Sequence, residues 1–144
     1  MQPFPHTYQV SAEAGVEGDV AVAAAGLPSF ASASPPEFDG PGGRWSPESL
    51  LCSAAASCFI LTFRAVARAS KFDWGHLSCR VEGTLERKDG ATQFTRVATH
   101  AILSVDAAAD RATAQRLLEK AERGCLIANS LKAERVLTTD IQST

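Results

Sequence analysis

One segment constrains the fold of this chain more than any other, an apolar, alanine-rich run that follows Ser46-Pro47-Glu48. Serine is a good N-cap, proline suits the first helical position, and glutamate in the first turn complements the helix dipole. We therefore predict a helix from Ser46 to about Ala69. Small side chains recur on one stripe of it and would let another helix approach closely, so we expect this helix to be central. The stripe consists of Leu51, Ala54, Ala55, Cys58, Thr62, Ala65 and Ala69.

The segments ahead of this helix have the pattern of strands and turns. Residues 6–12 and 19–27 alternate well enough for two strands, and the glycine-containing residues 13–18 would turn the chain between them. Residues 35–43 are rich in proline and glycine and are predicted to form a loop. We expect an N-terminal β-hairpin and a loop before the helix.

After this helix in the sequence come two segments, residues 76–87 and 94–105, in which apolar and polar side chains alternate. Both are rich in β-branched side chains. They are joined through Asp89-Gly90, a strong signal for a tight hairpin turn. Residues 110–123 carry an apolar stripe at helical spacing, and Gly124 is expected just beyond the end of that helix, at C′.

The end of the chain completes an α+β pattern. Residues 126–132 could form a short helix, and residues 134–141 read as a final strand. Strands and helices in this order favour the α+β class, and the length favours one domain over residues 1–144.

Composition excludes several functional classes. Hydrophobic residues make up 45% and charged residues 21%, as in ordinary globular proteins, and the net charge of -2 includes no dense basic patch for nucleic acid. No uncharged apolar run reaches bilayer length, so we expect no membrane-spanning helix. The first residues lack a basic segment followed by an apolar block, as a secretory signal would have. With four cysteines, we expect a cytoplasmic protein with reduced or catalytic thiols.

Three pieces of sequence carry a resemblance to a known family. They are residues 46–51 (Ser-Pro-Glu-Ser-Leu-Leu), residues 54–59 (Ala-Ala-Ala-Ser-Cys-Phe), and Gly124-Cys125 followed by residues 131–134 (Leu-Lys-Ala-Glu). Together with the order of the elements, they resemble the OsmC/Ohr family, the osmotically inducible protein C and organic hydroperoxide resistance proteins. The resemblance implies an OsmC-like fold in an intertwined homodimer, with two active sites at the interface.

The resemblance also implies a reaction, the thiol-dependent reduction of organic hydroperoxides, with hydrogen peroxide as a second candidate substrate. Cys58 would attack the peroxide and become a sulfenic acid, and Cys125 would resolve it as a disulfide. An external dithiol, of the dihydrolipoyl type, would return both to thiols. No metal or organic cofactor is implied.

The family also has an arginine in the loop before the cysteine helix, beside a phenylalanine. Here the comparable position reads Glu37-Phe38, and residues 1–43 contain no Lys or Arg, so Arg44 is the expected substitute. Glu48 would pair with this arginine and orient it. Both side chains also have simpler explanations, a solvated loop charge for Arg44 and a favourable first-turn charge for Glu48.

Helix geometry limits how Glu48 and Cys58 could share one site. Ten residues of helix separate them by about 15 Å along the axis, more than a carboxylate side chain can reach. The run between them holds no glycine or proline that would break the helix. We therefore expect Glu48 to reach Cys58 of a second chain across a two-fold axis.

The expected helices also bear on how easily each thiol ionises. Cys125 would lie at the start of a short helix, where free N–H groups favour a thiolate. Cys58 would lie in the middle of a helix without such help, so Arg44 would have to activate it.

Aromatic side chains near the cysteine helix suggest a substrate pocket. Phe38, Trp45, Phe59 and Phe63 could line an apolar site for an organic peroxide, although core packing is the commoner role of such residues. The alternative function is a non-enzymatic module that binds a small molecule or senses redox state, with Cys58 as a structural or sensing thiol.

Overall fold

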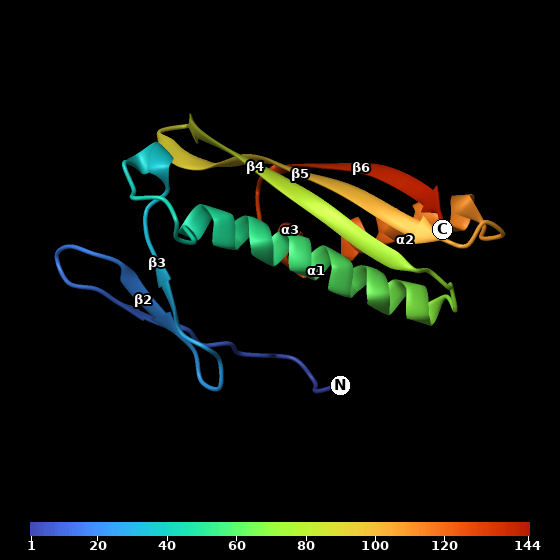
Figure 1. Cartoon of the computed structure of the whole chain (residues 1–144), viewed down its shortest axis with the longest axis horizontal. Coiled ribbons are helices and arrows are strands. Elements are labelled where there is room, and N and C mark those ends of the chain that lie inside the picture. Colours follow the sequence, from blue (N-terminus) through green and yellow to red (C-terminus); the bar gives the residue numbers. More distant parts are fainter. The chain divides into compact units, whose positions relative to one another are not determined.

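The computed structural model describes all 144 residues and divides them into two units, residues 1–50 and 51–144 (Figure 1). The first unit holds an antiparallel sheet of β1 (Ser11–Glu13), β2 (Val20–Ala23) and β3 (Phe30–Ser32), in that order. The predicted hairpin is confirmed, with shorter strands, but the third strand was not predicted. That the whole chain is one domain stays a prediction.

The loop that follows β3 is fixed by hydrogen bonds between its own backbone groups. It contains one short 3₁₀ helix, Pro36–Phe38, followed by Asp39 in the left-handed region (φ 61°). A Cβ atom on Gly40 would lie 1.6 Å from the Ser34 carbonyl oxygen, so only glycine fits there. The N–H of Ala33 donates to the carbonyl of Trp45 at 3.1 Å, which closes the loop just before the long helix.

Helix α1 (Pro47–Ala69) begins where the sequence predicts and is uninterrupted. The N–H of Ser49 donates to Ser46 Oγ at 3.1 Å, and the N–H of Ser46 donates to Ser49 Oγ at 2.9 Å. This reciprocal pair is the hydrogen-bond pattern of a capping box, with serine in place of the usual acidic or amide residue. Two backbone donors are satisfied, and the helix start is fixed.

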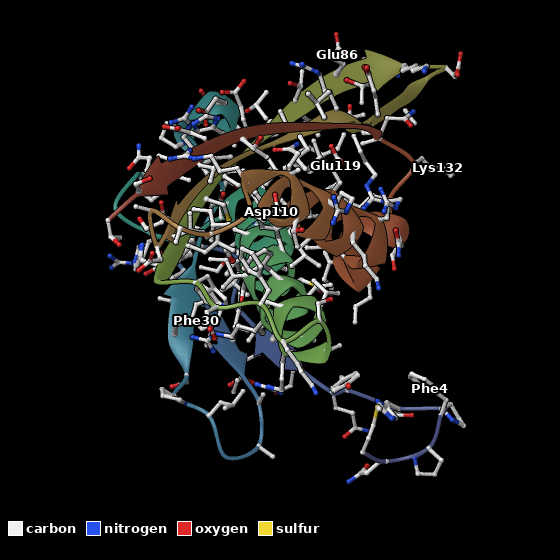
Figure 2. All side chains as sticks on the ribbon, turned by 90° about the vertical axis from the view of Figure 1, so that its right-hand side faces the viewer. Phe4, Phe30, Glu86, Asp110, Glu119 and Lys132 are labelled. Atoms are coloured by element: carbon white, nitrogen blue, oxygen red, sulfur yellow. The ribbon has the colours of Figure 1, made fainter.

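The second unit holds a sheet of β4 (His76–Lys88), β5 (Ala91–Val105) and β6 (Glu134–Ser143), in that order. β4 and β5 form the predicted hairpin, and β6 lies parallel to β5. A parallel neighbour needs a crossover connection, which α2 (Arg111–Gly124) and α3 (Leu126–Asn129) supply. Asp110, labelled in Figure 2, caps α2 by accepting the N–H of Ala112 at 3.0 Å.

The hydrophobic core lies between one face of this sheet and helices α1 and α2 (Figure 1). The buried side of α1 consists of Ala55, Phe59, Phe63 and Ala67, whereas Ala65 and Ala69 of the predicted stripe are exposed. The phenylalanines decide the orientation, because burying a phenyl ring removes far more apolar surface from water than burying a methyl group. The remaining core residues are Leu77, Ala101, Leu103, Val105, Ala114, Leu117, Leu118 and Ala121.

Two glycine predictions have different outcomes. Asp89 (φ 52°) and Gly90 (φ 77°) form the predicted tight turn. Gly124 is the last residue of α2, and its φ is not in the positive region, so its placement at C′ was wrong. A Cβ atom on Gly124 would lie 3.2 Å from Thr62 Cγ2, so glycine serves close packing against α1 instead.

Helix α1 also meets the length and composition of a membrane span, so the prediction that no helix could do so was too strict. This evidence is weak, because core helices of water-soluble proteins pass the same test. Ala55, Phe59, Phe63 and Ala67 of this helix are at most 3% exposed, and Phe59, Phe63 and Ala67 are core residues.

Candidate functional site

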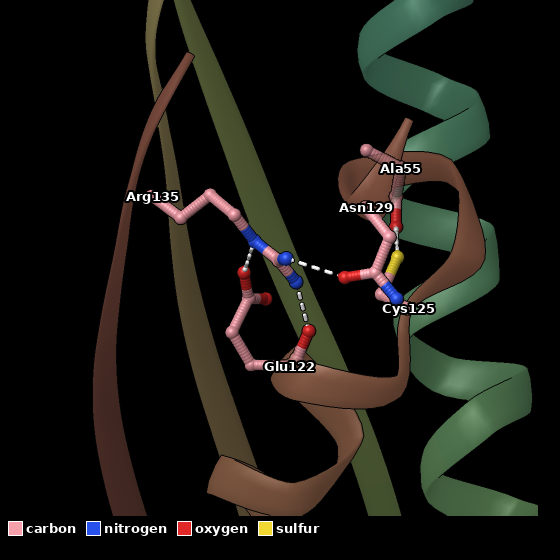
Figure 3. Close-up of polar contacts among 5 residues, drawn as sticks. All are labelled: Ala55, Glu122, Cys125, Asn129 and Arg135. Atoms are coloured by element: carbon pink, nitrogen blue, oxygen red, sulfur yellow. Dashed lines mark hydrogen bonds and ion pairs between the residues drawn. The ribbon is translucent and has the colours of Figure 1, made fainter. Parts of the chain in front are cut away.

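Cys58 and Cys125 are brought together by α1 and by the corner between α2 and α3. Cys125 is buried at this corner and Cys58 is half-buried on α1. The Cys125 thiol has two acceptors in reach, the Cys58 sulfur and, at 3.9 Å, the carbonyl oxygen of Ala55 (Figure 3). The hydroxyl of Thr62, one turn along α1, lies 3.9 Å from Cys58 Sγ. The two sulfurs are therefore hydrogen-bonding neighbours.

The start of α3 provides further donors to Cys58. The backbone N–H groups of Ile127 and Leu126, in the first turn of α3, hydrogen-bond to its sulfur. First-turn N–H groups have no partner within their own helix, and the side chain of the N-cap residue Cys125 does not cap them. The Cys58 sulfur, on α1, accepts hydrogen bonds from these N–H groups in place of a capping side chain.

This arrangement makes the two thiols unequal. Partial burial opposes ionisation of Cys58, but donors from Ile127, Cys125, Thr62 and Leu126 together hold its pKa below the ordinary value. Burial raises the pKa of Cys125, the N–H of Ala128 offsets part of this, and the neighbouring Cys58 and Glu122 charges raise it further. Cys58 is thus the more acidic thiol of the pair, and Cys125 is the less acidic one.

The surroundings of the two thiols differ in part from what the sequence predicts. Cys125 does stand at the start of a short helix, but its burial outweighs the nearby amide. Cys58 lies far from the N-terminus of its own helix, as expected, but it receives donors from Thr62 on that helix and from α3, which lies nearly seventy residues further along the chain. A thiolate beside a protonated thiol can attack an electrophile and then form a disulfide.

The other two cysteines are placed as packing residues. Cys52 lies against Gly83, where a Cβ atom would meet its sulfur at 2.9 Å. Cys79 donates to the carbonyl of Ala56 at 3.6 Å. Burial raises the pKa of both thiols, which makes them poor nucleophiles. No group of three or more His, Cys, Asp or Glu side chains lies close enough to hold a metal ion.

Four predicted site residues belong to residues 1–50. Arg44 pairs with Asp19, with Nε 2.9 Å from Oδ2, and both side chains are partly exposed. Glu48 lies in the first turn of α1, and Phe38 and Trp45 are exposed. Their participation in a site with Cys58 stays a prediction. Trp45 lines a hollow of about 390 Å³ together with Leu27, Pro28, Ser29, Phe30 and Leu50.

Phe59 and Phe63, predicted as pocket residues, are fully buried in the core of the second unit. Phe63 contacts Trp74 edge to face, with ring centroids 5.2 Å apart. Packing is the role that the structure gives them, and a contact with substrate stays a prediction.

An ion-pair network that the sequence does not predict lies next to Cys125. Arg135 on β6 binds Glu122 at the end of α2 and Asn129 at the end of α3 (Figure 3). Arg135 is only 13 residues from Glu122 and 6 from Asn129, but the three residues belong to three different elements, so no helical or strand period links them.

Comparisons with known proteins identify the family and agree with this fold. A sequence model of the OsmC-like protein family matches residues 40–140. The uncharacterized protein YmaD of Bacillus subtilis is 29% identical over 130 residues, which cover 88% of this chain and 87% of that protein. Peroxiredoxin OsmC of Escherichia coli is 26% identical over 106 residues, or 74% of this chain and 73% of that protein.

A solved structure extends the likeness to the fold. The organic hydroperoxide resistance protein OsmC from Legionella pneumophila has a TM-score of 0.76 and 26% identity, and the match covers 97% of this chain and 99% of that one. This confirms the predicted α+β fold, with an N-terminal sheet, a long cysteine-bearing helix, and further strands with a second helix.

Proposed function

Because the chain belongs to the OsmC-like protein family, we propose that it is a thiol peroxidase that reduces organic hydroperoxides. The observation that supports this most is the unequal pair of thiols, in which donors from α3 lower the pKa of Cys58 and burial raises the pKa of Cys125 beside it. The family includes a peroxiredoxin, and proteins of this fold include a hydroperoxide resistance protein.

The proposed reaction has two chemical steps on the protein. The Cys58 thiolate attacks the terminal oxygen of ROOH, the O–O bond breaks, and the alkoxide leaves as ROH after taking a proton. Cys58 is now a two-electron-oxidised sulfenic acid. The Cys125 sulfur then attacks the Cys58 sulfur, the S–O bond breaks, and water leaves as the disulfide forms.

A third step resets the pair. An external dithiol, for which we favour a dihydrolipoyl-type compound, reduces the disulfide to two thiols and becomes a disulfide itself. We place this cycle in the cytoplasm, where such reductants keep thiols reduced. No bound cofactor takes part.

We further propose that the working form is a homodimer in which the partner's Glu48 serves this chain's Cys58. Helix α1 is continuous from Pro47 to Ala69, so no break brings its own Glu48 towards Cys58. Leu61, on an apolar helix, is 56% exposed. A second copy of the helix would cover this side chain.

The test is peroxide consumption by the purified protein. With dihydrolipoamide as reductant, cumene hydroperoxide should be consumed faster than hydrogen peroxide, and a monothiol should support less turnover. Cys58→Ser should abolish activity, and Cys125→Ser should allow one oxidation of Cys58 and then over-oxidation. Cys79→Ser is the control and should remain active.

Peptide mapping completes the test. One equivalent of organic hydroperoxide should produce a Cys58–Cys125 disulfide. A bridge through Cys52 or Cys79 would overturn the assignment of the pair. A Cys58 that is alkylated no faster than free cysteine at neutral pH would support the binding or sensing alternative instead.

A further inference from the structure

Arg135 lies on the face of β6 that α2 covers. Its register partner on β5 is Val97, which is buried. Two more contacts join α2 to the same face of β6. Thr139 donates to Gln115 Oε1 at 2.6 Å, and Arg111, near the N-terminal end of α2, donates to the carbonyl of Ile141 and to Ser143 Oγ. Arg135 is the tether at the opposite end of the helix.

Each guanidinium nitrogen of Arg135 has its own acceptor. Nε lies 2.8 Å from Glu122 Oε1, Nη1 lies 2.6 Å from Asn129 Oδ1, and Nη2 donates to the Glu122 carbonyl (Figure 3). The Arg135 and Glu122 side chains are only 25% and 15% exposed. A planar guanidinium that uses all three nitrogens fixes direction as well as distance.

The acceptors stand at the two ends of the reactive corner. Along the chain, Glu122 lies before Cys125, and Asn129 lies after the N–H groups of Leu126 and Ile127 that bind the Cys58 sulfur. The Glu122 carbonyl also accepts the N–H of Cys125 at 3.3 Å. One side chain on the sheet therefore holds both the last turn of α2 and the end of α3.

The same contact balances a charge. Glu122 is an acid that acts on Cys125, and its carboxylate is paired with Arg135. The titratable or charged groups at the corner are Cys58, Cys125, Glu122 and Arg135, together with the exposed Arg123 in the last turn of α2. Without the guanidinium, the unpaired Glu122 carboxylate would oppose the ionisation of Cys125 more strongly.

We propose that Arg135 is a positioning residue. It holds the α2–α3 corner, with the N–H groups of Leu126 and Ile127, against the sulfur of Cys58. Its consequence for peroxide reduction rests on the function proposed above. Its effect on the reactivity of Cys58 does not, because any electrophile reports it.

The test is the alkylation of Cys58 by iodoacetamide as a function of pH, followed by mass spectrometry of the Cys58 peptide. Arg135→Gln should slow alkylation at pH 7 by on the order of 10- to 100-fold and move the midpoint of the pH profile upward. Arg135→Lys, which keeps the charge, should recover part of the rate. Asn129→Ala removes only one of the three bonds, at an exposed residue, and should cause a smaller change in the same direction.

Arg111→Gln is the matched control, because it removes an arginine tether between α2 and β6 at the far end of the helix. It should lower the melting temperature and leave the pH profile of Cys58 unchanged. A folded Arg135→Gln protein with a wild-type profile would overturn the proposal, as would an equal shift in Arg111→Gln. Should Arg135→Gln fail to fold, an unchanged profile in Asn129→Ala would count against it. The alkylation profiles can be measured even if the protein proves inactive towards peroxide, so the two proposals can fail separately.

Discussion

At the scale of single residues, the acidity of Cys58 depends on hydrogen-bond donors within its own chain, and two of these donors are backbone N–H groups of α3. The N–H of Leu126 is one of its donors, and Leu126 is the first residue of α3, with a side chain that is 65% exposed. Proline is tolerated at the first position of a helix and lacks this hydrogen. A single substitution can therefore delete the donor and keep the helix.

We predict that Leu126→Pro raises the pKa of Cys58 and slows its alkylation at neutral pH. Cys125, the residue before the new proline, is already extended (φ -65°, ψ 104°), as a pre-proline residue prefers. Leu126→Ala removes the side chain but keeps the N–H and should behave like the wild type. Equal pH profiles for the proline and alanine variants would show that this N–H contributes nothing.

A second residue-scale prediction concerns the contact between Gly124 and Thr62. A Cβ atom at position 124 would lie 3.2 Å from Thr62 Cγ2, closer than most such contacts. Gly124→Ala should therefore be more favourable by about 0.5–3 kcal/mol in a Thr62→Ser background, which lacks that methyl group, than in the wild type. Urea unfolding of the two single variants and the double variant measures this coupling. Additive changes in the free energy of unfolding would contradict it.

At the scale of the elements, the start of α2 has a built-in pH dependence. Asp110 accepts the Thr113 hydroxyl at 2.7 Å and the Ala112 N–H at 3.0 Å, and these bonds, the hydroxyl first, lower the pKa of its carboxyl group. A lowered pKa contributes stability that is present above the unfolded value of about 4 and is lost as pH falls through the folded value.

We predict that the melting temperature of the wild type falls more steeply below pH 4 than that of Asp110→Asn. Asparagine still caps the helix but does not ionise. The difference between the two melting curves isolates this residue from the other acids of the chain. Parallel curves between pH 2 and pH 5 would show that Asp110 titrates alike in the folded and unfolded states.

The elements also show how far sequence reasoning reaches. The start of α1 at Ser46 and the Asp89-Gly90 turn were predicted, because each depends on a few adjacent residues. Strand β3 (Phe30–Ser32) was missed, because three residues carry no readable alternation and pairing with β2 defines them. The α3 donors to Cys58 were missed because they too depend on pairing between distant segments. Only the tertiary fold brings α3 to α1.

At the scale of the whole molecule, α1 carries two residues, Glu48 and Cys58, that cannot reach each other within one chain. The helix is unbroken, so Glu48 and Cys58 of one chain stay about 15 Å apart along its axis. Cys58 and Cys125, in contrast, meet within one chain. A homodimer with shared sites therefore predicts different behaviour for these two pairs of residues when subunits are mixed.

We predict that Cys58→Ser and Glu48→Ala chains, each inactive alone, recover activity when their subunits exchange. In the mixed dimer one site combines an intact Cys58 with the partner's intact Glu48, and the other site lacks both. With half of the dimers mixed and one of two sites restored, about a quarter of the wild-type turnover should return. Cys58→Ser mixed with Cys125→Ser is the control and should recover nothing, because these sulfurs act within one chain. Recovery in the control, none in the first mixture, or full turnover by a monomer at micromolar concentration would each rule out a site shared in this way.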